Sequence, residues 1–246
     1  MDGVCKNKLA CGGQVRVEGN TRDAPCNIVK SGIRRNVMPN WCRTTIKIYH
    51  GEREKLNALW QKIDEWTSAI FCENDFGADW LGNVAGHSGI ATWNDGFYTE
   101  DGPLSCRGSI TDCSLDDDGL CIYTETAWVP MMQIWKRVCD KYLPGAEIVF
   151  DASEPGGELY QTNDAELIGK YSIDVLDTPP EEFEDVGSCP WADEEETIQF
   201  LQRVLETDED DIDELLELER GRRLECDGEA WFTVGKWEYR DIDECE

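Results

Sequence analysis

The segment from residue 206 to residue 219 contains nine carboxylate side chains, a dense set of acidic groups over a short length of chain. If the segment were helical, at about 1.5 Å per residue it would extend over roughly 20 Å. Duplex DNA presents on the order of 12 phosphate charges over that distance. The spacing therefore predicts a partner-binding surface that imitates a nucleic-acid backbone, formed by Glu206, Asp208, Glu209, Asp210, Asp211, Asp213, Glu214 and Glu217. The alternative interpretation is an acidic face that only keeps the protein in solution.

A second acidic run resembles a calcium-binding loop in its spacing. Residues 114–125 match an EF-hand loop at four positions, with Ser114 in place of the first Asp. An EF-hand needs a helix on each side, whereas the flanking residues alternate in polarity as strands do. We expect a tight hairpin turn here and no bound metal.

Catalysis by a histidine and a thiol would require His87, in a glycine-rich stretch, to meet Cys42, Cys72 or Cys106. No local nucleophile signature accompanies these residues, so we assign no catalytic residues and no cofactor. The other histidine, His50, is expected to end a strand.

The irregular stretch 71–102 carries aromatic side chains that could stack on nucleic-acid bases. The basic side chains that accompany such stacking platforms are missing, so a packing or partner-binding role is favoured. The stretch itself is expected to be a long loop or a set of short turns. The aromatic residues are Trp80, Trp93, Phe97 and Tyr98.

The chain has 12 cysteines but no Cys-x-x-Cys pair. Several lie among apolar residues, where a free thiol packs as a small hydrophobic side chain. We interpret them as reduced thiols, with structural zinc and disulfides as the alternatives. The absence of a long apolar run and of a secretory signal predicts a cytoplasmic protein.

Elements that position these residues follow from hydrophobic periodicity. Residues 41–50 alternate as a half-buried strand, and residues 52–66 place apolar side chains on one helical face. A hairpin, a helix with Pro130 in its first turn and further strands follow through residue 176. The order β-α-β-β-α-β predicts an α+β fold with a ferredoxin-like (split βαβ) antiparallel sheet.

Two acidic amphipathic helices are predicted after residue 177. The first covers 193–206 with Asp193 as its N-cap, and the second starts with a capping box at Thr207. The closing residues 229–241 predict a terminal hairpin around Gly235 and Lys236.

Charge divides the chain into three predicted units. Residues 1–37 carry a net charge of +4 and form a weakly ordered basic extension, and residues 38–176 form the core domain at −13. Residues 177–246 form an acidic helical unit at −20, out of a total of −29. This charge excludes unassisted binding to nucleic acid or to an anionic membrane.

Three motifs resemble a known family. Met38-Pro39-Asn40-Trp41-Cys42 opens a strand, Thr126-Ala127-Trp128-Val129-Pro130 joins a strand to a helix, and Glu154-Pro155-Gly156 follows the last core strand. Together they are similar to the YubB-like family of phage- and plasmid-encoded proteins, over about residues 38–175. The resemblance implies a ferredoxin-like fold and a mobile-element origin, and no catalytic residues.

These observations lead to two functional hypotheses. The first is a non-enzymatic, mobile-element-encoded inhibitor whose acidic surface binds a basic host protein, such as a nuclease or a CRISPR-type RNA-guided effector. The alternative is a small-ligand or nucleotide-processing enzyme that uses the loop 71–105.

Overall fold

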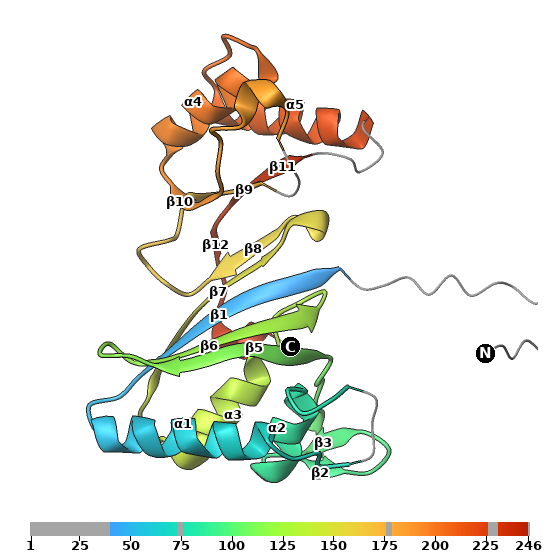
Figure 1. The fold of residues 1–246 in the computed structure, drawn as a ribbon, viewed down its shortest axis with the longest axis vertical. Coiled ribbons are helices and arrows are strands. Elements are labelled where there is room, and N and C mark those ends of the chain that lie inside the picture. The colour runs from blue at the N-terminus through green and yellow to red at the C-terminus, as the bar shows by residue number, and fades with distance from the viewer. Residues whose placement is uncertain (1–39, 73–75, 176–178, 226–230, 246) are drawn as a thin grey trace, which may run out of the picture. The chain divides into compact units, whose positions relative to one another are not determined.

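The computed structural model describes residues 40–72, 76–175, 179–225 and 231–245 (Figure 1). The predicted basic extension 1–37 lies outside the described residues. Helices and strands mix along the chain in an α+β fold, and no helix in the described part is long and apolar enough to cross a membrane. The α-helices are α1 (Arg53–Thr67), α2 (Leu81–His87), α3 (Met132–Tyr142), α4 (Glu194–Leu205) and α5 (Ile212–Glu225).

The largest sheet has six strands in the order β12-β8-β7-β1-β6-β5. Neighbouring strands are antiparallel except β12, which pairs parallel with β8. The chain runs from β1 through α1 to β5 and β6, then through α3 to β7. The strands are β1 (Trp41–Tyr49), β5 (Gly108–Leu115), β6 (Leu120–Ala127), β7 (Glu147–Glu154), β8 (Leu159–Thr162) and β12 (Glu238–Tyr239).

Alternation in β1 gives the sheet one apolar face. Cys42, Ile46 and Ile48 are buried, whereas Arg43 and Lys47 between them are exposed. The buried side chains pack with the apolar stripes of α1 and α3, which lie together beneath the sheet in Figure 1. Covering one face with helices removes that face from water, which accounts for the period of two in the strand.

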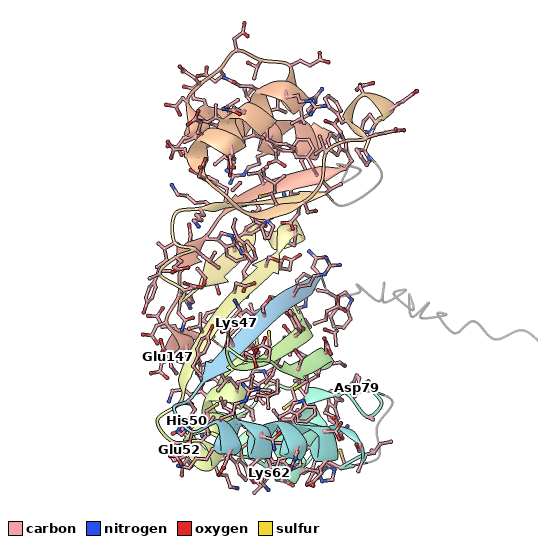
Figure 2. The ribbon with its side chains drawn as sticks, turned by 60° about the vertical axis from the view of Figure 1, so that its left-hand side comes forward. Lys47, His50, Glu52, Lys62, Asp79 and Glu147 are labelled. Atoms are coloured by element: carbon pink, nitrogen blue, oxygen red, sulfur yellow. The ribbon has the colours of Figure 1, made fainter. Side chains whose placement is uncertain are left out.

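The turn into α1 uses the first histidine. His50 Nδ1 accepts the backbone N–H of Glu52 at 3.0 Å, and Figure 2 places both residues where β1 leads into the helix. This confirms His50 as a half-buried residue at the strand end. Helix α3 begins only at Met132, so Pro130 precedes the helix instead of occupying its first turn.

The acidic run after residue 114 forms a hairpin turn, as predicted. Strands β5 and β6 pair antiparallel on either side of it. Asp116 Oδ1 accepts the backbone N–H groups of Asp118 and Gly119 at 3.0 and 2.9 Å. The Asp carboxylate therefore closes the turn as a local acceptor, which is a common role for Asp in turns.

The stretch 71–102 is more regular than its sequence indicates. It contains α2 and a small sheet of β2 (Thr92–Trp93), β3 (Phe97–Thr99) and β4 (Gly102–Pro103). Trp80 and Phe97 are buried with ring centroids 5.6 Å apart, whereas Trp93 and Tyr98 are exposed. Contacts among aromatic rings replace hydrophobic periodicity as the source of order here.

A second sheet carries the acidic helices. Its order is β10-β9-β11, from strands β9 (Tyr171–Val175), β10 (Cys189–Ala192) and β11 (Phe232–Lys236). Leu201 and Val204 of α4 and Leu215 of α5 share a core with these strands. Strand β9 precedes the domain boundary predicted at residue 177 and pairs with two strands that follow it.

The predicted terminal hairpin is wrong. Strand β11 pairs with β9, and β12 pairs with β8, so the chain stays extended through Trp237. A Cβ on Gly235 would lie 1.9 Å from the Tyr160 ring. Glycine is therefore needed for close approach of the backbone to an aromatic ring and does not mark a turn.

Candidate acidic interface and adjoining pocket

The predicted acidic surface lies on the connection between α4 and α5 and on the first half of α5. Helix α4 ends at Leu205, and Glu206 adopts a left-handed conformation with φ of 55°. Residues 207–211 form a loop before α5 begins. The condition of a helix over the whole of 206–219 is therefore not met, because the left-handed residue turns the chain out of α4.

Most of the predicted acidic residues face solvent. Glu209 is half-buried, and the others are exposed. One of them, Glu209, also holds the loop in shape. Glu209 Oε1 accepts the N–H groups of Asp210 and Asp211 at 2.9 and 3.0 Å, and Gln202 donates to the Glu209 carbonyl at 2.8 Å. The loop is therefore fixed by its own carboxylates.

Helix α5 begins at Ile212, with Asp211 and not Thr207 in the N-cap position. Asp211 Oδ1 accepts the N–H groups of Asp213 and Glu214 at 3.0 and 3.2 Å, as an N-cap side chain does. The Thr207 hydroxyl instead accepts the N–H of Glu209 within the loop. Thr207 and several of the acidic residues after it are residue types that can act as N-caps. The sequence pattern alone therefore pointed to Thr207 and not to Asp211.

The carboxylates of the acidic surface form no ion pairs within the part of the chain that the structure describes, although the charges of Asp213 and Lys236 interact at longer range. Among the described residues, none of the ion pairs uses any of the eight predicted interface carboxylates. The nearby basic cluster at the end of α5 is already engaged: Arg220 and Arg223 pair with Glu158 at 2.9 and 2.6 Å. Arg222 Nη1 donates to the Val204 carbonyl at 2.8 Å. The negative potential of this surface is therefore available to another molecule.

An open groove of about 580 Å³ runs beside the acidic residues. The groove is lined by the apolar side chains of Leu205 and Leu218 and by the carboxylates of Glu214 and Glu217. Leu218 is half-exposed although it lies on a helix of a folded unit. A groove of apolar side chains with acidic borders suits a basic amphipathic segment.

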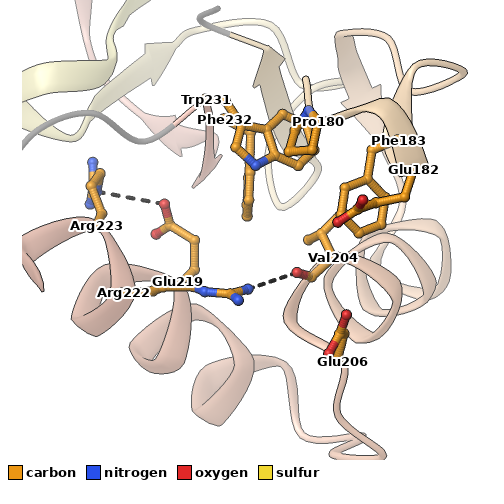
Figure 3. Close-up of a pocket in the computed structure, with 10 residues that line it drawn as sticks. All are labelled: Pro180, Glu182, Phe183, Val204, Glu206, Glu219, Arg222, Arg223, Trp231 and Phe232. Atoms are coloured by element: carbon orange, nitrogen blue, oxygen red, sulfur yellow. Dashed lines mark hydrogen bonds and ion pairs between the residues drawn. The ribbon is translucent and has the colours of Figure 1, made fainter. Parts of the chain in front are cut away.

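A smaller pocket of about 200 Å³ lies between α5, the end of α4 and the second sheet (Figure 3). Phe183, Trp231 and Phe232 form aromatic wall. The Phe183 and Trp231 rings stack with centroids 5.5 Å apart and an interplanar angle of 18°. Glu206, one of the predicted interface residues, also lines this pocket.

Glu219 is the buried acid of this pocket. It is 3% exposed, and its Oε1 accepts no hydrogen bond from the described residues. Arg223 Nε lies 3.5 Å from that oxygen, and burial raises the pKa of Glu219 to about 7. Burial of this oxygen is costly, because it has lost water and gained only the long contact with Arg223 in return.

The sequence prediction omitted Glu219 from the interface, although a signal was present. Ile212, Leu215 and Leu216 mark the apolar stripe of α5, and Glu219 continues it at the i+7 position. An acid on the buried face of a helix is unusual and calls for a partner. The aromatic wall gave no such signal, because Phe183 and Trp231 are far apart in sequence.

The three family-like motifs meet at one end of the six-stranded sheet. The Trp128 N–H donates to the Asn40 carbonyl at 3.0 Å, and a Cβ on Gly156 would lie 2.5 Å from Asn40 Nδ2. Trp128 has φ of 74°, which is strained for a bulky side chain. Arg223 donates to the Pro155 carbonyl at 3.2 Å, so α5 is anchored on this junction.

The His87 ring contacts a backbone carbonyl and an aromatic side chain. Its Nε2 lies 3.1 Å from the Ala69 carbonyl, and Phe71 packs edge-on against the imidazole. Burial raises the pKa of Cys42 to about 11 and of Cys106 to about 12, which keeps these thiols protonated. The part of the chain described by the structure holds no cluster of three His, Cys, Asp or Glu side chains suited to a metal ion.

Comparison with known proteins gives no match: no family profile fits the chain, and neither the curated proteins nor the solved structures include a significant relative.

Proposed function

We propose that this protein binds a basic protein partner through the acidic connection between α4 and α5 and acts without catalysis. The observation that carries the proposal is the set of exposed carboxylates over 206–217, which take part in none of the ion pairs among the described residues. Such a surface attracts Arg and Lys groups that would otherwise hold nucleic-acid phosphates. The partner is accordingly a nucleic-acid-binding defence protein, such as a nuclease or an RNA-guided effector.

Rigidity of the surface supports this proposal. Hydrogen bonds from backbone N–H groups to Glu209 and Asp211 fix the loop and the start of α5. Ion pairs of Arg220 and Arg223 with Glu158 fix the far end of the helix. A preorganised charge array loses less conformational entropy on binding than a mobile acidic tail.

The proposal includes a fold and an origin. We infer a ferredoxin-like core from the strand order β7-β1-β6-β5 with helices between β1 and β5 and between β6 and β7. Asn40, Trp128 and Gly156 each belong to one of the three family-like motifs, and they lie close together. This proximity supports membership of the YubB-like family, because it gives motifs that are far apart in sequence a common structural role. A phage or plasmid origin and a place in the host cytosol belong to the same proposal.

The test is charge reversal at positions that do not hold the loop. Asp208, Asp210, Asp213 and Glu217 are exposed, and changing all four to Lys should abolish capture of the partner identified by pull-down from the host and mass spectrometry. Wild-type affinity should fall steeply with salt, and duplex DNA should compete for the partner.

The matched control reverses four exposed carboxylates elsewhere, namely Glu54, Glu65, Asp117 and Glu166, which changes net charge equally. This control should bind at near wild-type affinity. If the 208–217 variant binds normally, or if both variants lose binding equally, the acidic connection is not the interface.

A further inference from the structure

The pocket beside the acidic surface is lined by Glu219, which carries a buried acceptor that no hydrogen-bond donor of the described residues satisfies. Glu219 Oε1 is buried and without a hydrogen bond among the described residues, and Glu219 lines the pocket with its carboxyl group turned toward Arg223 in Figure 3. An incoming N–H group would recover the hydrogen bond that burial removed.

Guanidinium groups that line the pocket are already held by acceptors of the protein. Arg222 donates to the Val204 carbonyl at 2.8 Å, and the shortest contact of Arg223, 2.6 Å, is with Glu158. Only the longer contact of 3.5 Å joins Arg223 to Glu219. Glu182 and Glu206 add two exposed carboxylates at the pocket. Glu219 therefore contributes a weakly paired carboxyl group to the pocket lining, which suits a donor that carries positive charge.

The walls restrict the shape of that donor. Phe183, Trp231 and Phe232 present aromatic rings, and aromatic faces attract cations and stack on planar groups. The volume of about 200 Å³ is smaller than the roughly 300–1,000 Å³ of pockets that enclose drug-sized ligands. A single side chain fits this size better than a nucleotide does.

We propose that the pocket receives one arginine side chain of the basic partner, with its guanidinium donating to Glu219 and its plane against Trp231. Arginine satisfies both demands, because its guanidinium is planar, carries several donors and is weakly hydrated, unlike the lysine ammonium group. This inference rests on the proposed function, and Glu206 connects the two, since it belongs to the acidic surface and to the pocket. The arginine would be an anchor at the centre of the interface.

The experiment compares octa-arginine with octa-lysine, which have equal charge, by titration calorimetry against the full chain at low salt. The wild-type protein should bind octa-arginine about tenfold more tightly than octa-lysine. This ratio of the two dissociation constants is equivalent to about 1.4 kcal/mol. Glu219→Gln and Phe183→Ala should each bring the ratio close to one. The matched control Glu195→Gln, an exposed acid on α4, should keep the wild-type ratio.

Two results separate this inference from the proposed function. If the 208–217 reversal variant loses both peptides while Glu219→Gln retains the tenfold ratio, the pocket assignment is overturned and the acidic interface stands. If wild type binds neither peptide, the interface proposal fails. The pocket proposal is then tested separately by titrating the protein with Nα-acetyl-arginine amide. A shift of the Glu219 carboxyl carbon signal in NMR supports the pocket, and an unchanged signal rejects it.

Discussion

Individual side chains in this protein are explained by what surrounds them more than by their type. Asp116 and Asp211 both lie in acidic runs, yet each accepts backbone N–H groups and fixes a turn or a helix start. Glu219 lies in the same kind of run but is buried without a hydrogen bond. Among the described residues, acidic side chains close together in sequence therefore include groups that fix the backbone, exposed groups of the proposed interface, and the buried Glu219.

Glu219 should make stability depend on pH. Burial raises its pKa to about 7 from 4.5, so the folded state favours the protonated form. Stability from this group is fully present below pH 4.5 and declines as pH rises through 7. Glu219→Gln should therefore increase the free energy of unfolding by about 2 to 3 kcal/mol at pH 8 and have little effect near pH 4. Urea unfolding across this range measures the difference.

The control for this prediction is Glu217→Gln, which changes an exposed acid on the same helix. Its effect should stay within about 0.5 kcal/mol at every pH. An unchanged pH dependence in Glu219→Gln would show that the Glu219 carboxyl is ionised without cost.

Gly235 should be intolerant of any side chain. A Cβ there would meet the Tyr160 ring at 1.9 Å, and the Tyr160 hydroxyl is held by Asp174 and Thr233 at 3.2 and 3.1 Å. Gly235→Ala should cost about 1 to 3 kcal/mol or more through overpacking. Gly51→Ala is the comparison, because nothing lies within 4 Å of its Cβ position. Equal thermal midpoints for the two variants would contradict the packing argument.

Elements were predictable where a single periodic pattern decided them. Strand β1, helix α1 and the N-cap of α4 follow from alternation, an apolar stripe and Asp193. The predicted element boundaries were wrong where several residues could cap a helix or where aromatic contacts replaced hydrophobic periodicity. Helix α5 shows the first case, and the stretch 71–102 with its small sheet shows the second.

The start of α5 can be tested with two substitutions. Asp211→Ala should destabilise the protein by about 1 kcal/mol, because two N–H groups lose their acceptor. Thr207→Ala removes only one hydrogen bond of 3.2 Å within the loop and should cost less. Chemical denaturation of both variants measures the order. A larger loss for Thr207→Ala would favour the capping box predicted from the sequence.

At the scale of the whole molecule, the acidic helices and the six-stranded sheet are joined by more than one kind of contact. Strand β12 adds to the edge of the larger sheet, and β9 pairs with strands that follow it in the second sheet. Tyr160 packs edge-on against Trp237, and Arg223 pairs with Glu158. Residues 38–246 also cluster as one unit by their contacts.

These connections predict one cooperative unfolding transition for the full chain. Differential scanning calorimetry should give a single peak whose calorimetric and van't Hoff enthalpies agree. Glu158→Ala, which removes the carboxylate shared by Arg220 and Arg223, should lower the midpoint without splitting the peak. Two separate transitions would favour the independent units predicted on either side of residue 177.

By itself, the amino-acid sequence determined the α+β class, the early strand and helices, and the concentration of negative charge after residue 177. These are local properties, since alternation, apolar stripes and charge counts need no distant partner. Tertiary structure alone decided that 206–211 is a loop, that Gly235 faces an aromatic ring, and that Glu219 shares a pocket with Phe183 and Trp231. Those features depend on which distant residues meet, and burial without a donor makes Glu219 differ from the exposed acids beside it.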